Sequence, residues 1–364
     1  FFDPLLSGNK NISCASCHDP SRGTGDGKPL SFGEGGDLLP RHTPPLYNLG
    51  QPFIHRLFWD GRVSQRASGF RTPEPGLNGP NPALGEIAAA LGSALAVQTL
   101  FPMVNPSEMR GKPGSNDVAD APSNAGAWEL LAQRITADES YKKNLAETYP
   151  NVPLEKINIG HIAHALAAHI GSAFDSRLTN WDRYLSGDTN AMSPREKRGA
   201  RVFLSEKAKC VLCHNGPLLS DFEMHTVAFP QIGPGFAPSG DDFGGFAVKP
   251  VSEGVFFSFR TSPLRNVALT GPYTHSGSLR SLRDVLLHYT NQAKSLSEYQ
   301  ISWVQSQYAI PIAHATQNDP LRLSFMSQDV SSPPITLSAE EIEDLLHFLE
   351  QSLTDTSLVQ PSAQ

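Results

Sequence analysis

Charge is scarce in this sequence, and long apolar runs are missing. Asp, Glu, Lys and Arg make up 18% of the 364 residues, and the formal net charge is −7. A nucleic-acid partner would require a basic face, so the acidic balance argues against one. The apolar stretches fall well short of the ~18 residues that a membrane-spanning helix needs. We therefore expect a globular chain without a membrane span.

Glycine and proline, by contrast, are plentiful, with 30 residues of each. This content exceeds average usage but stays below the level of disordered chains, which indicates a compact, loop-rich protein. A length of 364 residues favours two domains, because a typical domain has about 150. The chain opens at Phe1 and Phe2 without a charged leader segment, so we expect that any export signal has been removed.

Cysteine is rare, and all four cysteines belong to two C-x-x-C-H motifs. The motifs consist of Cys14, Cys17 and His18, and of Cys210, Cys213 and His214. Positions i, i+3 and i+4 of a helical turn share one face, so two thiols can bind the vinyl groups of one porphyrin while the histidine faces its iron. C-x-x-C-H is the attachment signature of c-type haem, and the sequence therefore predicts two covalently bound haem c groups.

Two other chemistries use paired cysteines. One structural zinc ion could bind both pairs, but zinc does not require a histidine directly after each pair. A thioredoxin-like redox pair is possible for one motif, but not for two without the matching βαβ pattern. Haem c is attached outside the cytoplasm in bacteria, so we expect a periplasmic protein, in a compartment where free thiol pairs would tend to form disulfides.

The second motif begins about one domain length after the first, and the residues before the two motifs are weakly alike. We therefore expect a mainly α fold of two cytochrome c-like haem domains with long structured loops, covering residues 1–190 and 191–364. Ser193 with Glu196, and Ser338 with Glu341, form capping boxes that predict helix starts. Further predicted elements are helices at 84–100, 125–148, 156–180 and 278–290 and a short strand at 255–259.

Several other motifs resemble the bacterial di-haem cytochrome c peroxidase/MauG superfamily, and more closely its MauG-like branch, which includes MbnH-like proteins. They are residues 41–48, 57–62, 105–109, 263–273 and 287–289, which together with the two haem motifs span nearly the whole chain. The resemblance implies that the N-terminal haem, bound by His18, is high-spin and reacts with hydrogen peroxide. The C-terminal haem, bound by His214, would be six-coordinate and pass electrons.

One position that separates peroxidases from MauG-like enzymes lies in the loop after the first motif. Peroxidase members place a distal histidine there, which caps the iron until reduction releases it. By resemblance, Glu34 occupies this place, and a carboxylate is a poor substitute for imidazole on ferric haem. The first haem is then expected to be open without reductive activation, unless the loop aligns differently and His42 takes the position.

The other distinguishing position is the sixth ligand of the C-terminal haem. Peroxidase members have a methionine seventeen residues after the proline of a Thr-x-Pro pair; here the pair is Thr270 and Pro272, and the count reaches Tyr289. A methionine ligand raises the haem potential and suits an electron port, whereas tyrosinate favours high oxidation states of iron. The alternative is that Tyr289 only packs, with His288 or Met326 as the ligand.

The resemblance assigns roles to three further residues. Trp59 would lie between the haems and carry charge, and Glu108, six residues after Pro102, would lie over the first haem. A carboxylate there can move a proton between the two peroxide oxygens, with its pKa raised by desolvation. The family core leads us to expect fewer residues between Trp59 and Glu108, so we infer an insertion around 70–100 near the first haem pocket.

The resemblance also implies a calcium ion between the haems. Thr270 and Pro272 would supply backbone carbonyls, and an asparagine usually completes the protein ligands. In this sequence His42 follows Arg41 where that asparagine is expected. Calcium prefers oxygen donors, so this replacement disfavours the site unless water fills the gap.

These residues are compatible with three functions. The favoured one is an enzyme that uses hydrogen peroxide to form a high-valent two-haem intermediate and then oxidises aromatic residues, foremost tryptophan, of a partner protein. The alternatives are a cytochrome c peroxidase that draws electrons from a small cytochrome, which Tyr289 disfavours, and a non-catalytic electron carrier, which Glu108 disfavours. A small cytochrome or a copper protein is a further candidate partner.

Overall fold

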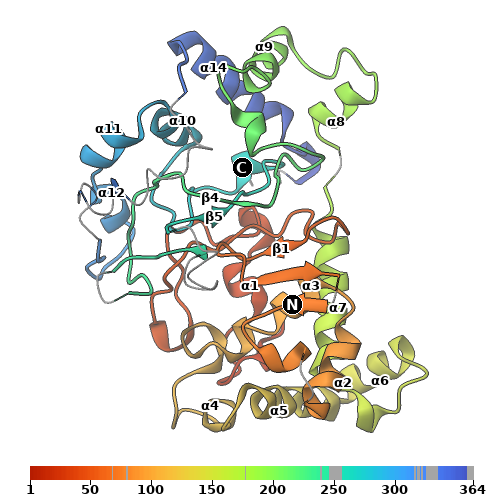
Figure 1. Ribbon diagram of the computed structural model, residues 1–364. Helices are drawn as coiled ribbons and strands as arrows, with labels where there is room; N and C mark the ends of the chain where they lie inside the picture. Colours follow the sequence, from red (N-terminus) through yellow and green to blue (C-terminus); the bar gives the residue numbers. More distant parts are fainter. Residues whose placement is uncertain are drawn as a thin grey trace, which may run out of the picture.

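A computed structural model describes residues 1–67, 69–78, 81–176, 178–237, 240–245, 256–314, 317, 320, 323–324 and 335–358 (Figure 1). Helices dominate these residues and the strands are short, so the expected mainly α fold is confirmed. None of the described helices is long and apolar enough to cross a membrane. Met326 and the first residue of the strand expected at 255–259 lie outside the described residues.

The α-helices are α1 (Cys14–Cys17), α2 (Pro82–Leu91), α3 (Ala94–Thr99), α4 (Asp117–Asp120), α5 (Asn124–Ala137), α6 (Glu139–Thr148), α7 (Ile159–Ala173), α8 (Asn180–Leu185), α9 (Pro194–Phe203), α10 (Leu282–Thr290), α11 (Gln292–Ser297), α12 (Ser302–Gln305) and α14 (Ala339–His347). Short 3-10 or π turns lie at η1 (Pro4–Leu6), η2 (Pro20–Arg22), η3 (Glu34–Gly36), η4 (Pro75–Asn78), η5 (Pro102–Val104), η6 (Pro106–Arg110), η7 (Leu154–Lys156), η8 (Cys210–Leu212), η10 (Val267–Leu269), η11 (Phe348–Ser352) and η12 (Thr356–Leu358).

Two small antiparallel sheets complete the described fold. Strands β1 (Arg56–Leu57), β2 (Val63–Arg66) and β3 (Gly69–Arg71) form one, and β4 (Met224–His225) pairs with β5 (Phe259–Arg260) in the other. The sequence analysis did not predict the first sheet. The second contains only the end of the strand expected at 255–259.

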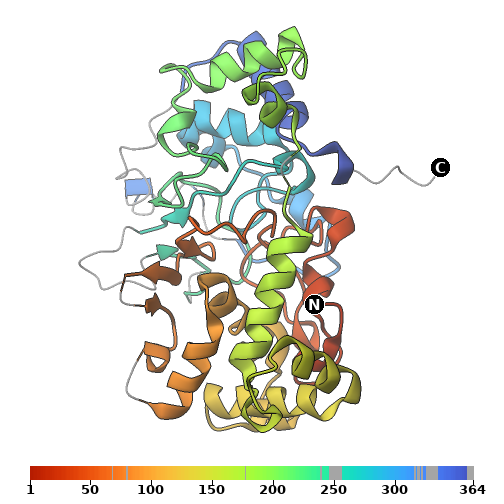
Figure 2. The ribbon, with the colours of Figure 1, turned by 90° about the vertical axis from the view of Figure 1, so that its right-hand side faces the viewer.

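Two large apolar cores divide the molecule. One packs α2, α3, α5 and α7 around the fully buried Trp128 and lies in the lower half of Figure 1. The other packs α9, α10 and α14 around Leu345 and Phe348 and lies in the upper half. The view turned by 90° shows the same division along the long axis (Figure 2). A boundary at residue 190 stays a prediction, although the second core begins at Met192.

The predicted helix starts are present, with some helices divided. Both capping boxes form, at Ser193 and at Ser338. The helix predicted at 84–100 is divided into α2 and α3, because Gly92 has a φ of 70° and the Ser93 side chain caps α3. The one predicted at 125–148 is divided into α5 and α6, because Asp138 is extended and caps α6. Helices α7 and α10 are shorter than predicted, since side-chain caps begin each within the expected range.

The contact between α9 and α14 requires a glycine. A Cβ atom at Gly199 would collide with the Asp344 carbonyl oxygen and lie 2.6 Å from the Phe348 Cβ. Gly85, on α2, has nothing within 4 Å of the place where its Cβ would be. The two glycines are therefore a matched pair for testing this packing.

We expect Gly199→Ala to lower the free energy of unfolding by about 1–3 kcal/mol, the usual cost of overpacking a core. Gly85→Ala should raise it by about 0.5–1 kcal/mol, because alanine is the better helix former. Urea unfolding of both variants, followed by far-UV circular dichroism, measures the difference. Equal effects of the two substitutions would contradict the close α9–α14 contact.

Candidate functional site

Each C-x-x-C-H motif lies on a single short turn. Helix α1 carries the first, and η8 begins the second. The backbone N–H of His18 donates to the Cys14 carbonyl at 2.9 Å, and that of His214 donates to the Cys210 carbonyl at 2.8 Å. Each turn therefore places two sulfurs and one imidazole on the same side, as the spacing predicts.

Both histidines are oriented by a backbone carbonyl. The Nδ1 atom of His18 lies 3.0 Å from the Thr24 carbonyl oxygen, and that of His214 lies 3.0 Å from the Leu219 oxygen. An Nδ1–H donor leaves Nε2 with a free lone pair, which is the arrangement of an iron-ligating histidine. Burial lowers the pKa of both rings, which favours the neutral form that a metal binds.

The two motifs open into two different cavities. We call N-cavity the one lined by Cys14, Cys17, His18, Pro102 and Glu108, and C-cavity the one lined by Cys210, Cys213, His214, Thr270, Pro272 and Tyr289. The two cysteine pairs thus do not meet around one zinc ion. The cysteines form no disulfide. Each cavity combines two thiols, an oriented imidazole and largely apolar walls, so the residues present fit one haem c group in each.

Glu108 faces the N-cavity in a low-dielectric environment. Burial raises the pKa of its carboxyl group above the ordinary value, although the charges of Arg62 and Arg41 oppose this shift. Asn105 fixes one carboxyl oxygen, since its side-chain nitrogen donates to Glu108 Oε1 at 2.9 Å. Pro102 begins the η5 turn of the same segment. The structure therefore brings Glu108 and Pro102 together with His18 in one cavity.

Glu34 does not line the N-cavity. Its side chain is 5% exposed and accepts hydrogen bonds from Asn9 at 2.7 Å and from Asn11 at 3.3 Å. The side chain therefore packs with polar groups of the N-terminal segment. His42 lines both cavities, and its Nδ1 atom bonds to backbone carbonyls.

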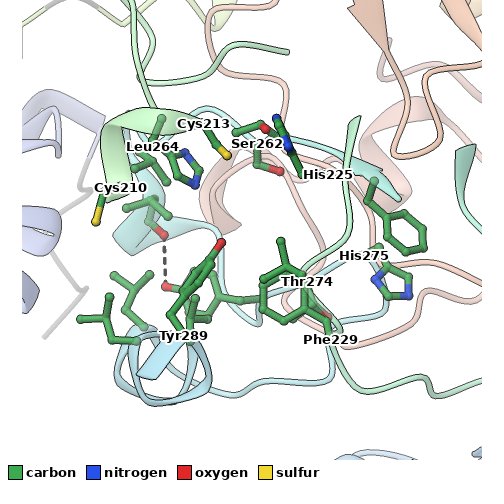
Figure 3. Close-up of a pocket in the computed structure, with 18 of the residues that line it drawn as sticks. Cys210, Cys213, His225, Phe229, Ser262, Leu264, Thr274, His275 and Tyr289 are labelled. Carbon is green, nitrogen blue, oxygen red and sulfur yellow. Dashed lines mark hydrogen bonds between the residues drawn. The ribbon is translucent and has the colours of Figure 1, made fainter. Parts of the chain in front are cut away.

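Tyr289 lies across the C-cavity from Cys210 and Cys213 (Figure 3). No hydrogen bond to its hydroxyl group is present among the described residues, and burial raises the pKa of the phenol. His288, the alternative ligand, is fully buried, with Nδ1 2.9 Å from Ser295 Oγ and Nε2 2.8 Å from the Val227 carbonyl. Both its ring nitrogens are engaged and His288 is not part of the C-cavity lining, which favours Tyr289 over His288 as the residue facing a bound group.

Trp59 and His42 are the two residues that line both cavities. The Trp59 indole N–H donates to the His42 carbonyl oxygen at 2.8 Å. The backbone of Trp59 is also fixed, because its carbonyl accepts the Arg260 N–H at 2.8 Å. The position between the cavities suits the role that the resemblance gives to Trp59.

Three residues around the cavities were missed by the sequence analysis. Arg260 is buried in the wall of the C-cavity and bonds to the carbonyls of Phe58 and Thr261, and burial lowers its pKa to about 10. His275 is 2% exposed and stacks on Phe259 with ring centroids 3.7 Å apart, and neither of its ring nitrogens has a hydrogen-bond partner among the residues that the structure describes. Such donors suit the propionate groups of a porphyrin.

The third missed residue, Gln98, lines the N-cavity with a buried side-chain oxygen that has no hydrogen-bond partner in the described part of the chain. It lies in the 70–100 segment, which was expected near the first haem pocket, and Leu95 and Thr99 line the same cavity. The only sequence signal for these residues was their position next to recognised motifs, since burial without a partner depends on packing between distant segments.

Comparison with known proteins agrees with this geometry. Residues 1–190 match the family model described as di-haem cytochrome c peroxidase. The chain is 29% identical over 290 residues to the methylamine utilization protein MauG of Methylorubrum extorquens, covering 79% of this chain and 66% of that protein. It is 29% identical over 289 residues to cytochrome c551 peroxidase of Pseudomonas aeruginosa, and this match covers 79% of this chain and 68% of that protein.

The chain thus spans about two thirds of the length of these two relatives. A crystal structure of a MauG-like protein associated with microbial copper homeostasis matches it with a TM-score of 0.67 and 26% identity, over 100% of this chain and 89% of that one. Together, the family match, the two haem motifs and the two cavities show that the chain belongs to the di-haem cytochrome c peroxidase family, an oxidoreductase class whose members carry two haem groups.

Proposed function

We propose that this protein uses hydrogen peroxide to oxidise aromatic side chains, foremost tryptophan, of a partner protein in the periplasm. The observation that carries the proposal is Tyr289, which faces Cys210 and Cys213 across the C-cavity and whose hydroxyl has no hydrogen-bond partner among the described residues. A tyrosinate ligand favours retention of an oxidising equivalent, whereas the methionine of a peroxidase favours rapid electron uptake. The similarity to MauG and to a MauG-like copper homeostasis protein also supports it.

When bound, the two haem groups supply peroxide-driven one-electron oxidation. His18 and His214 would hold the irons, and the four motif cysteines would hold the porphyrins. In the overall reaction, hydrogen peroxide takes up two electrons and two protons and becomes two water molecules. The partner side chain gives up those two electrons and two protons, so atoms and charge balance.

Glu108 is the residue that we assign to proton movement. Asn105 holds its Oε1 atom, which leaves Oε2 as the oxygen that can take and return a proton. Burial raises the pKa of the Glu108 carboxyl group toward neutral pH, and an acid–base group works best when its pKa lies near the working pH. Trp59 places an oxidisable indole between the two cavities, and its N–H is fixed by the His42 carbonyl.

A cytochrome c peroxidase reaction is the second candidate. It is supported by the similarity to cytochrome c551 peroxidase of Pseudomonas aeruginosa, which is as high as that to MauG. In that reaction a small cytochrome would supply the electrons. For the first candidate the partner is a protein with an oxidisable aromatic residue, and the structural similarity makes a copper-handling protein a candidate for it.

The deciding experiment mixes the haem-loaded protein with hydrogen peroxide and proteins encoded beside its gene. We expect oxidised tryptophan peptides by mass spectrometry, and slow oxidation of reduced horse-heart cytochrome c. Turnover of that cytochrome at the roughly 10 s⁻¹ of a typical enzyme, without tryptophan oxidation, would favour the peroxidase reaction instead.

Substitution of Glu108 tests the proton transfer. Glu108→Gln keeps an oxygen for the Asn105 contact but removes the acid–base group, so peroxide consumption should slow by about 10²–10⁴-fold. Glu34→Gln is the matched control, because Glu34 is also buried but outside the N-cavity lining. Stopped-flow absorbance measures both, and an unchanged rate in Glu108→Gln would exclude the role.

Substitution of Tyr289 tests the assigned ligand. Tyr289→Met should raise the reduction potential of the second haem and abolish tryptophan oxidation, because a thioether stabilises ferrous iron. Tyr273→Phe is the control: Tyr273 also lines the C-cavity, but its hydroxyl donates to the Val267 carbonyl at 3.1 Å. Spectroelectrochemical titration should show a shift only in Tyr289→Met. Identical potentials in wild type and Tyr289→Met would refute ligation by this tyrosine.

A further inference from the structure

Arg260, on strand β5, connects the wall of the C-cavity to the segment that carries Trp59. Its backbone N–H donates to the Trp59 carbonyl at 2.8 Å, and its side-chain Nε donates to the Phe58 carbonyl at 3.1 Å. Phe58 and Trp59 both line the N-cavity, whereas Arg260 lines the C-cavity. One residue of the C-cavity wall is therefore bonded twice to the segment that places the indole between the two cavities.

The backbone of Phe58 is held in an unusual conformation at this contact. Its φ of 63° is left-handed, which is rare for a residue with a side chain and persists only where the surroundings fix it. The Phe58 carbonyl accepts the Gly61 N–H at 3.4 Å as well as Arg260 Nε, and the Arg62 guanidinium lies 3.7 Å from the Phe58 ring centroid. The Arg260 side chain is thus one of the groups that hold this turn.

The Arg260 guanidinium is buried without a carboxylate partner. The side chain belongs to a residue that is 6% exposed, and its remaining hydrogen bond runs from Nη1 to the Thr261 carbonyl at 3.1 Å. Among the described residues it makes no ion pair, whereas the buried Arg41 binds two carboxylates. Burial and the nearby Arg56 charge lower the pKa of Arg260 to about 10, so the group is still charged at neutral pH. Because buried charges are ordinarily paired, this wall is complementary to an anion.

The porphyrin that fits the C-cavity carries such anions. Its two propionate side chains are carboxylates, and they project from the edge opposite to the one that Cys210 and Cys213 attach. A guanidinium binds a carboxylate through two parallel N–H donors, and Nη2 of Arg260 makes no hydrogen bond among the described residues. Nη2 and the second N–H of Nη1 can therefore bind one propionate while Nε keeps the Phe58 carbonyl.

Other donors in the wall of the C-cavity are less suited to this charge. Lys209 directly precedes Cys210, at the edge where the porphyrin is attached. His225 already contacts an aspartate carboxylate at 2.8 Å. Burial lowers the pKa of His275 to about 4, so its ring is neutral and donates only one N–H. Among the described residues of this wall, Arg260 is the one buried cation.

We propose that Arg260 binds one propionate of the second porphyrin and thereby ties that porphyrin to the backbone of Phe58 and Trp59. Its positive charge opposes the extra charge of ferric iron, so it raises the reduction potential of the second haem. Arg260 is then a positioning residue, because it fixes the porphyrin relative to the indole between the cavities. This role requires the second haem group and is the same for either candidate reaction.

Reduction potentials of two charge variants test this role. Arg260→Gln removes the charge, and we expect the reduction equilibrium of the second haem to shift about tenfold toward the ferric state, or ~59 mV for a one-electron couple. Arg260→Lys keeps the charge and should shift the equilibrium by less than about threefold. Spectroelectrochemical titration of the haem-loaded proteins measures both shifts, and EPR spectra check that the iron ligands are unchanged.

Arg265→Gln is the matched control for the loss of an arginine. The Arg265 side chain is 9% exposed, pairs with Asp182 and donates to the Pro217 carbonyl at 2.7 Å, and it does not line the C-cavity. Its substitution should shift the second-haem equilibrium by less than about threefold. Equal shifts in Arg260→Gln and Arg265→Gln would overturn the proposal, and a tenfold shift in Arg260→Lys would count against an effect of charge.

Resonance Raman spectroscopy gives a second readout that does not require Arg260→Gln to fold. The bending vibration of the haem propionates reports their hydrogen bonds, and an ammonium group cannot reproduce the planar fork of a guanidinium. We expect this band to move in Arg260→Lys and to stay in place in Arg265→Gln. An unchanged band in Arg260→Lys would contradict propionate binding. Both measurements are made without a partner protein, so they are independent of whether a tryptophan or a cytochrome is oxidised.

Discussion

The hydrogen bond from the Trp59 indole to the His42 carbonyl is the contact on which the arrangement of the two cavities depends. It joins the two residues that line both cavities, and each of them is also bonded to the C-terminal half. A buried N–H that lost this acceptor would cost about 1–3 kcal/mol, so the indole has little freedom to rotate away. The indole is thereby held in one position between the two cavities.

A buried charge network supports the same junction. Arg41 binds Asp60 at 2.6 Å and Asp242 at 2.5 Å, and Arg62 binds Asp60 at 2.9 Å. Although burial opposes it, Arg41 and Arg62 lower the pKa of Asp60 to about 2, so this carboxyl group is charged at neutral pH. Asp60 is next to Trp59 in the sequence, and Asp242 belongs to the C-terminal part of the chain. Arg41 therefore connects the segment of Trp59 to the C-terminal half. Removal of one partner would leave a buried charge uncompensated.

The features that the sequence predicted are those set by residues that lie close together along the chain. The C-x-x-C-H turns and the capping boxes depend on residues within five positions of one another, so their spacing was sufficient to find them. Tyr289 was found by counting from Pro272, and the structure places both residues in the C-cavity. The division of the 84–100 helix could have been anticipated from Gly92 and Ser93, which are ordinary helix-ending and helix-starting residues.

Other features depend on contacts between distant segments and had no local pattern. The partners of His42 are backbone carbonyls, which every residue has, so no residue type announces them. Arg260 and His275 became candidates only when the structure showed them buried in the wall of the C-cavity. Glu34 was expected at the distal position of the first haem, but it does not line the N-cavity, and its contacts with Asn9 and Asn11 depend on how the N-terminal segment folds back.

The close contact of α9 with α14 has a consequence for the order in which the chain folds. Helix α14 ends at His347, near the C-terminus, and the second core includes residues as far as Leu353. The first core includes residues from Leu6 to Phe222, which follows the second C-x-x-C-H motif, and Leu269 and Leu358 pack against it. During synthesis from the N-terminus, neither core can therefore close before the chain has passed the second motif, so both cysteine pairs are made while apolar residues of the two cores are still missing.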